Sequence, residues 1–315
     1  MQSPIATSPQ TELRLFGRQV TVPRPLVRAV ALGLLIGLGW WIVGLVLRAT
    51  QDFFVWGDQL WTFTLADVGF LTPYDLPGFV NTPWTLIPLL PLSYLPFELA
   101  VLAQMLIYYG ALAAIIVKFG RPSRAAKRRW LPHPVVIVLA SPLALDAALN
   151  LNIDWIVCLG LLVPPLWSGP FLLAKPQLAT GYILSFSRRD LVRWLIVVLI
   201  TGIISLLIWG PWPLDLLESF QRYEVAWGIN MAPMALLPAP IGVPVSIGIG
   251  VLLAVFAVRR RDALLGVLAG LFFVPYVASY SLLLPFALIT ARLPRVGLLV
   301  TVSLWLIVAV LAVSL

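Results

Sequence analysis

The chain of 315 residues is 61% hydrophobic and only 11% charged, whereas a soluble globular domain carries about a quarter charged residues. This composition excludes a soluble protein and predicts a polytopic membrane protein. The formal net charge of +8 indicates membrane orientation, so we expect membrane lipids and no nucleic acid as partners. One histidine and one cysteine are too few for a His/Cys metal site or an intramolecular disulfide.

The N-terminal part of the chain predicts a short leader and a first membrane span. Residues 1–26 are polar and contain four prolines, so we expect a flexible or interfacial cytoplasmic leader. Residues 27–47 form an apolar run of roughly the ~20 residues that span a bilayer. Everything from residue 27 to residue 315 is expected to form one transmembrane domain, with outer loops at 49–96 and 210–233. Within the first outer loop, prolines interrupt residues 83–96, which predicts a juxtamembrane segment instead of a span.

The rest of the chain alternates between apolar stretches and polar turns. The apolar stretches are residues 97–117, 132–147, 155–186, 191–209, 234–258, 263–291 (a hairpin turning near Pro275) and 296–315. Residues 155–186 fit this scheme only if their two apolar halves are short, tilted or re-entrant. Residues 210–233 have an amphipathic pattern. Together these stretches predict an all-α polytopic bundle of about ten spans.

The positions of the basic residues predict the orientation. Of the 21 lysines and arginines, 18 fall in the leader with Arg28 at its membrane edge, or in the turns assigned to the cytoplasm. Only Arg48, Lys175 and Arg222 lie at or near the opposite face. This asymmetry follows the positive-inside rule. It predicts a cytoplasmic N-terminus in a bacterial cytoplasmic membrane.

The most polar stretch between the spans is residues 51–84, with four aspartates and no lysine or arginine. Asp52 follows the first span, where partial desolvation would raise the pKa of a carboxyl group toward the range of a general base. Asp52 is therefore the candidate base, and Asp58 and Arg48 are candidate substrate contacts. An interfacial cap or an ion pair with Arg48 is the alternative for Asp52. Four aspartates are compatible with a divalent cation, but no pair has a spacing that specifies one, so no metal ligand is assigned.

Three polar residues near the middle of the chain recur every four positions. Asp146, Asn150 and Asp154 would lie along one face of a single helix. Acidic groups in membrane segments are costly unless they face a cavity or a partner. Asn150 and Asp154 are therefore candidate substrate contacts, with an ordinary polar turn as the alternative.

Two basic residues are candidates for contacts with an anionic substrate. Lys175 lies among apolar residues, and the phosphate of a lipid-linked donor would supply the counter-charge that an embedded ammonium needs. The alternative is a structural ion pair with Asp146 or Asp154. Arg222, in the second outer loop, is a further candidate for a phosphate or sugar contact, or else a solvated side chain.

Several short motifs in order resemble one membrane enzyme family. The motifs are DFFVW at 52–56, TPY at 72–74, FVNTPWTLIPLLPLSYLP at 79–96, NLNIDW at 150–155, AKPQ at 174–177 and VPYVASYSLLLPF at 274–286. This order is similar to that of GT-C glycosyltransferases of the polyprenol-phosphate-mannose-dependent type. The chain departs from the family in having Leu149-Asn150 where Gly-Gln is usual. We also expect no soluble C-terminal domain after the last span.

The resemblance implies a fold and an activity. It implies a GT-C-like bundle that transfers a mannose-like sugar from a polyprenyl-phosphate donor to a glycan or lipid acceptor on the extracytoplasmic face. Asp52 would act as base, and Lys175 with the Asn150/Asp154 turn would contact donor or acceptor. Two other functions stay open. A carrier or flippase for a lipid-linked substrate would use Asp146, Asp154 and Lys175 to line a pathway, and a non-catalytic subunit would need none of the outer aspartates.

Overall fold

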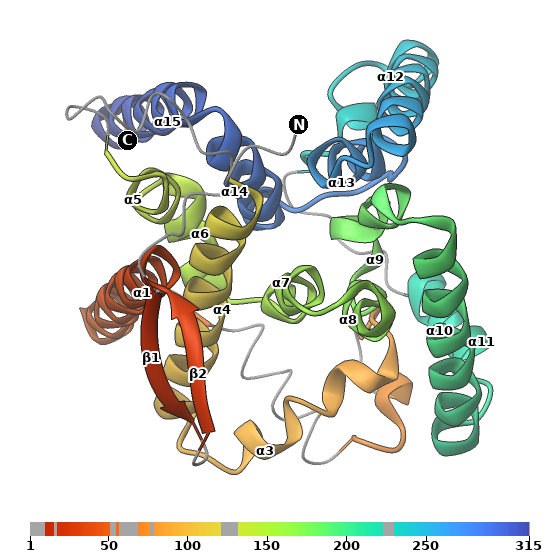
Figure 1. Cartoon of the computed structure of the whole chain (residues 1–315). Helices are drawn as coiled ribbons and strands as arrows, with labels where there is room; N and C mark the ends of the chain where they lie inside the picture. Colours follow the sequence, from red (N-terminus) through yellow and green to blue (C-terminus); the bar gives the residue numbers. More distant parts are fainter. Residues whose placement is uncertain are drawn as a thin grey trace, which may run out of the picture.

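The computed structural model describes residues 10–15, 18–50, 55–56, 69–75, 79–120, 132–222 and 230–314. The helices in these ranges are compatible with the predicted all-α bundle of a multi-pass membrane protein (Figure 1). Five described helices are long and apolar enough to cross a membrane. They are α1 (Arg24–Thr50), α4 (Phe97–Phe119), α10 (Arg188–Trp209), α12 (Ala239–Arg260) and α15 (Pro294–Ser314).

Shorter helices connect the long ones. The α-helices are α3 (Leu90–Ser93), α5 (Pro134–Leu139), α6 (Pro142–Asn150), α7 (Asp154–Leu162), α8 (Ser168–Leu172), α9 (Pro176–Ala179), α11 (Trp212–Arg222), α13 (Ala263–Leu271) and α14 (Leu283–Arg292). The 3-10 helices are η1 (Pro73–Asp75), η2 (Pro83–Leu86), η4 (Pro165–Trp167), η5 (Thr180–Ser185), η6 (Pro233–Ala235) and η7 (Ser279–Leu282).

The segment before the first span contains regular structure that the sequence did not predict. Strands β1 (Gln10–Leu15) and β2 (Arg18–Pro23) pair antiparallel as a hairpin, where we expected a flexible or interfacial leader. The helix α1 then begins at Arg24. The Arg24 Nε donates a hydrogen bond to the Gln10 carbonyl at 3.1 Å, so the start of the helix is attached to the hairpin.

Helix α4 is the central helix of the bundle. Of its most apolar window, 67% is buried inside the protein, against 11–22% for the other four long helices. Helix α1 packs closely along it because Gly33 brings the two backbones together: a Cβ at Gly33 would lie 2.6 Å from the Tyr109 carbonyl oxygen. Small residues allow this kind of close approach between membrane helices.

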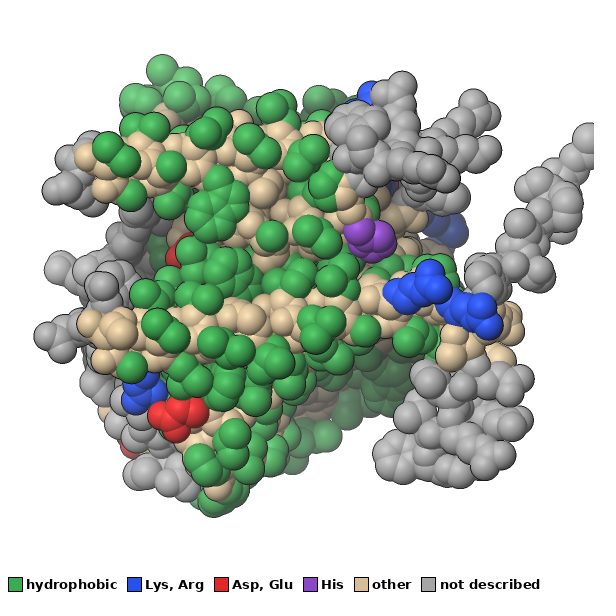
Figure 2. All heavy atoms as spheres, turned by 90° about the vertical axis from the view of Figure 1, so that its left-hand side faces the viewer, with side chains coloured by type: hydrophobic (Ala, Val, Ile, Leu, Met, Phe, Trp, Pro, Cys, Tyr) green, Lys and Arg blue, Asp and Glu red, His purple; other side chains and the backbone are tan. Residues whose placement is uncertain are grey.

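The less buried helices lie around α4 and expose apolar surface. Figure 1 shows α1, α10, α12 and α15 at the outside, with α4 and α7 between them. On the face in Figure 2, hydrophobic side chains cover the length of the helices and charged side chains lie toward their ends. Such an apolar band is expected where helices contact lipid.

The expected ten spans are not confirmed. The described residues contain five candidate spans, or six if the bent pair α6 and α7 counts as one. The predicted hairpin at 263–291 consists of α13 and α14 with η7 between them. Helices of 9 and 10 residues are roughly 14–15 Å long, about half the hydrocarbon thickness of a bilayer.

Side chains from distant helices satisfy the backbone where the short helices break. Between α5 and α6, the Leu139 carbonyl accepts the Trp40 Nε1–H at 2.8 Å and the Ala140 carbonyl accepts the Trp305 Nε1–H at 2.8 Å. One turn later, the Tyr109 hydroxyl donates to the Ala144 carbonyl at 2.6 Å. Irregular backbone is tolerated at membrane depth only when protein groups satisfy it in this way.

Candidate functional site

The residues predicted from the sequence fall in different parts of the structure. Asp52 and Asp58 lie outside the described residues, so their predicted roles stay predictions. Arg222 ends α11, and its side chain also lies outside the described part. The guanidinium of Arg48 pairs with Glu98 at 3.4 Å and lies over the Phe97 ring at 4.7 Å. This end of α1 is therefore attached to the start of α4.

The prediction that Asp146, Asn150 and Asp154 share one helix face is wrong. Asp146 and Asn150 lie on α6, which ends at Asn150, and Asp154 is the first residue of α7. The two helices are bent by 116°. Leu151, at the break, has a left-handed backbone with φ 46°. The spacing of four residues therefore continues across a sharp turn and does not follow one helix.

Lys175 and Asp154 form an ion pair inside the protein. The Lys175 Nζ lies 2.5 Å from Asp154 Oδ1, and the two side chains are only 8% and 2% exposed. The ammonium also donates to Ser281 Oγ at 3.1 Å and to Asn152 Oδ1 at 3.4 Å. All three N–H donors of the lysine thus have acceptors within the chain. The sequence left three candidates for the counter-charge of Lys175: a donor phosphate, Asp146 and Asp154. In the structure this counter-charge is Asp154.

The short helix η7 contributes three consecutive side chains to this region. Ser279 hydrogen-bonds to the Asp146 carboxylate, and the Tyr280 hydroxyl accepts Asn152 Nδ2 at 2.9 Å. Ser281 accepts from Lys175, and the Tyr280 ring lies 4.8 Å from the Lys175 ammonium. Together these side chains form what we call the bend cluster. They come from α6, the α6–α7 break, α7, the residue before α9, and η7. The members are Asp146, Asn150, Asn152, Asp154, Lys175, Ser279, Tyr280 and Ser281.

The members of the bend cluster differ in how deeply they are buried. Asp146, Asn150, Asn152, Ser279 and Tyr280 are half-buried, and Asp154, Lys175 and Ser281 are buried. Because polar groups at a helix break in a membrane bundle are costly, their concentration here marks this region as the leading candidate site.

Sequence reasoning missed several of these residues. Asn152 and the hydroxyl residues 279–281 were not candidates, although both lie inside motifs quoted for the family resemblance. A run of hydroxyl side chains in an otherwise apolar hairpin was the available signal.

Trp56, in the acidic loop after α1, is bonded to the end of α6, next to the bend cluster. Its backbone N–H donates to the Leu149 carbonyl at 3.0 Å, and its indole Nε1–H donates to the Ala148 carbonyl at 3.0 Å. The ring is fully buried and fits against α1 because position 44 is glycine: a Cβ there would lie 2.3 Å from the ring. Ala148 and Leu149 directly precede Asn150, which is a member of the bend cluster.

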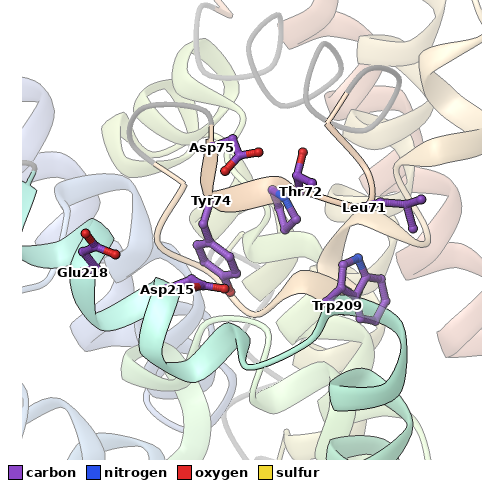
Figure 3. Close-up of a pocket in the computed structure, with 8 residues that line it drawn as sticks. Leu71, Thr72, Tyr74, Asp75, Trp209, Asp215 and Glu218 are labelled. Atoms are coloured by element: carbon purple, nitrogen blue, oxygen red, sulfur yellow. The ribbon is translucent and has the colours of Figure 1, made fainter.

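A second polar feature is an acidic pocket of about 190 Å³. Its lining comes from the segment around η1 and from the end of α10 with α11: Leu71, Thr72, Pro73, Tyr74, Asp75, Trp209, Asp215 and Glu218. Figure 3 shows Tyr74 and Asp75 on the η1 side, with Asp215 and Glu218 projecting from α11. Among the described residues, no lysine or arginine lines this pocket.

The chemistry of the acidic pocket follows from its carboxylates. Burial, and then the nearby Asp215 carboxylate, raise the pKa of Tyr74. Its hydroxyl therefore stays protonated and donates to the Asn81 carbonyl at 2.8 Å. Carboxylates accept hydrogen bonds from hydroxyl or ammonium groups and repel phosphate. Among the described residues, no group of three His, Cys, Asp or Glu side chains is arranged to hold a metal ion.

Comparison of the chain with protein-family models, curated proteins and solved structures found no match.

Proposed function

We propose that the chain is a membrane glycosyltransferase that moves a mannose-like sugar from a polyprenyl-phosphate donor to a glycan or lipid acceptor. One observation carries the proposal: Trp56 attaches the loop that holds Asp52 and Asp58 to the end of α6, next to the bend cluster. Trp56, four residues after Asp52, thus lies next to the polar residues expected to contact substrate, although about 90 residues separate them in the sequence.

In this proposal Asp52 is the general base. It would take the proton of the acceptor hydroxyl while that oxygen attacks the anomeric carbon. The bond between this carbon and the phosphate oxygen breaks, and polyprenyl phosphate leaves with inversion at the sugar. A positioned carboxylate typically contributes about 10²–10⁴-fold to such a step.

The bend cluster would provide contacts beside the reacting sugar. Lys175 and Asp154 are assigned a positioning role, because they form an ion pair with each other inside the protein. The half-buried members, including Asp146 and Asn150, are the ones that a substrate would reach. This assignment differs from the prediction that Lys175 itself binds the donor phosphate, which would require the ion pair to open.

The acidic pocket is proposed to bind acceptor hydroxyl groups. Its carboxylates accept hydrogen bonds from hydroxyls, and Tyr74 and Trp209 provide aromatic surface. In the proposed orientation this pocket and the end of α1 face the extracytoplasmic side of a bacterial cytoplasmic membrane. The β hairpin would then lie on the cytoplasmic side.

The decisive experiment uses purified protein in nanodiscs with radiolabelled polyprenyl-phosphate mannose, glucose or arabinose. Loss of label from the lipid-linked sugar is followed for the wild type, Asp52→Asn and Asp67→Asn, a matched control in the same loop. We expect Asp52→Asn to be at least about 100-fold slower and Asp67→Asn to keep the wild-type rate. Equal turnover in all three proteins would remove Asp52 from the mechanism.

The buried Lys175–Asp154 pair favours a second candidate, a carrier for a lipid-linked substrate. Ionisable pairs inside a membrane bundle commonly mark transport pathways. A carrier would move labelled lipid across a vesicle membrane without consuming it, and the transport would survive Asp52→Asn. Saturable binding with neither turnover nor transport would instead favour a non-catalytic subunit.

A further inference from the structure

We propose that an anionic phospholipid binds between α10 and α12, with its phosphate held by arginines at one end of these helices. The inference does not depend on the proposed transferase activity. It starts from the arginines that end or begin neighbouring helices: Arg188, Arg189 and Arg193 on α10, Arg259 and Arg260 on α12, and Arg261 directly after it. We call this set the arginine rim.

Contacts between neighbouring elements place the arginine rim at one end of the bundle. The Tyr182 ring of η5 packs against Phe119, which ends α4, with ring centroids 6.0 Å apart. Arg292, which ends α14, pairs with Asp262 just before α13. A Cβ at Gly120 would lie 3.5 Å from the Ala291 carbonyl oxygen, so α4 and α14 end together.

Glycines hold η5 directly against α13. A Cβ at Gly181 would lie 2.1 Å from the Gly266 carbonyl oxygen, and a Cβ at Gly266 would lie 2.4 Å from the Gly181 carbonyl oxygen. This backbone contact joins the segment that leads into α10 with the helix that follows α12. Figure 1 shows the segment from α9 to the start of α10 between α13 and α10. Among the described residues, the short helices η5 and α13 therefore lie between α10 and α12 at this end of the bundle, and no long helix separates the two.

The rim is strongly positive and its charges are not balanced within the described residues. All six rim arginines are exposed, and none of them forms an ion pair with another described residue. Of the acidic residues nearby in sequence, Asp190 hydrogen-bonds to Ser187 and Asp262 pairs with Arg292. Within the described residues, the six rim arginines therefore face only the carboxylate of Asp190 as a neighbouring counter-charge that is not already ion-paired. A phosphate group would supply further counter-charge.

Both helices also offer apolar surface next to the rim. On α10, Val192, Leu195 and Ile196 are each 51–52% exposed. On α12, Val258 is 55% exposed and Leu252 is 57% exposed. Exposed apolar surface beside a basic rim fits acyl chains below an anionic headgroup. Free phosphate or a soluble anion would use the rim and leave this apolar surface unused.

The test measures lipid affinity of the purified full chain by native mass spectrometry. The probes are phosphatidylglycerol, phosphatidylcholine and inorganic phosphate. The site variant is Arg188→Gln/Arg189→Gln/Arg260→Gln. The control variant, Arg24→Gln/Arg28→Gln/Arg295→Gln, removes three exposed arginines from α1 and α15 and lowers the net charge equally. A third variant with lysine at the three site positions keeps the charge.

We expect the wild type to prefer phosphatidylglycerol over phosphatidylcholine. Each arginine near the lipid surface contributes about fivefold, so the site variant should lose at least about tenfold in affinity for phosphatidylglycerol. The control and lysine variants should stay within about twofold of the wild type. Circular dichroism checks that all variants fold.

Four results would overturn the proposal. Equal losses in the site and control variants would show diffuse attraction to the whole basic end. Equal affinity for the two lipids, or displacement of lipid by inorganic phosphate, would show that no anionic phospholipid is selected. A dimer without bound lipid would show that a second copy covers this surface.

Discussion

Removing one partner of the Lys175–Asp154 pair should destabilise the protein far more than replacing both. In Lys175→Met the Asp154 carboxylate stays 98% buried and loses its 2.5 Å partner. Breaking a buried pair in this way costs about 3–5 kcal/mol, whereas an apolar replacement of both partners is often neutral. We therefore expect a large loss in the single variant and recovery in Lys175→Met/Asp154→Leu.

The assay is thermal unfolding in one detergent, followed by circular dichroism. With about 2 °C per kcal/mol, the low end for large domains, a loss of 3–5 kcal/mol corresponds to a Tm decrease of about 6–10 °C. The double variant should unfold within about 3 °C of the wild type. Asp154→Leu alone completes the double-mutant cycle and leaves the ammonium without its carboxylate.

The control variant replaces a lysine outside the bend cluster with methionine. Lys118 lies in the last turn of α4 and donates to the Leu161 carbonyl at 2.7 Å, so Lys118→Met loses hydrogen bonds without leaving a carboxylate unpaired. If Lys175→Met unfolds within 2 °C of the wild type, or if the double variant is as unstable as the single, the pair does not hold the bend cluster together.

Two further predictions concern other contacts. Gly44→Ala places a methyl group 2.3 Å from the Trp56 ring, so its Tm should fall by several degrees, whereas Gly39→Ala, with nothing within 4 Å, should keep or raise the Tm. Burial alone would raise the pKa of Asp262. Hydrogen bonds from Arg292 and from backbone N–H groups, together with the positive charge of Arg292, outweigh this effect, so the pKa of Asp262 is lowered overall. This stabilisation is complete above the unfolded pKa of about 3.9 and is lost as the pH falls through the folded value. The Tm of the wild type should therefore drop below about pH 4 more steeply than that of Asp262→Asn, and parallel pH profiles would contradict the assignment.

The sequence predicted the long helices well because their signal is local. Residues 27–47, 97–117, 191–209, 234–258 and 296–315 each lie largely inside a helix of the structure. About 20 apolar residues suffice to define a span, and a helix satisfies its own backbone without help from distant residues.

The candidate site was only partly predictable. Lys175 and Asp154 were recognised as charges in an apolar chain, which is a property of composition. Their pairing was left open because the sequence places Asp146 and Asp154 at equivalent positions of one expected helix. The hydroxyls of η7, more than 100 residues away from Lys175, carried no comparable signal.

The sequence by itself determined the five long apolar helices, the positions of the basic residues along the chain and the chemical types of the candidate residues. Only the tertiary structure decided where the shorter helices break and which polar groups meet. The turn after Asn150 contains neither glycine nor proline, and Trp56 donates to the carbonyls of Ala148 and Leu149 just before it. In an apolar environment a helix ends where a partner satisfies its freed carbonyls, and that partner is about 90 residues away in the chain.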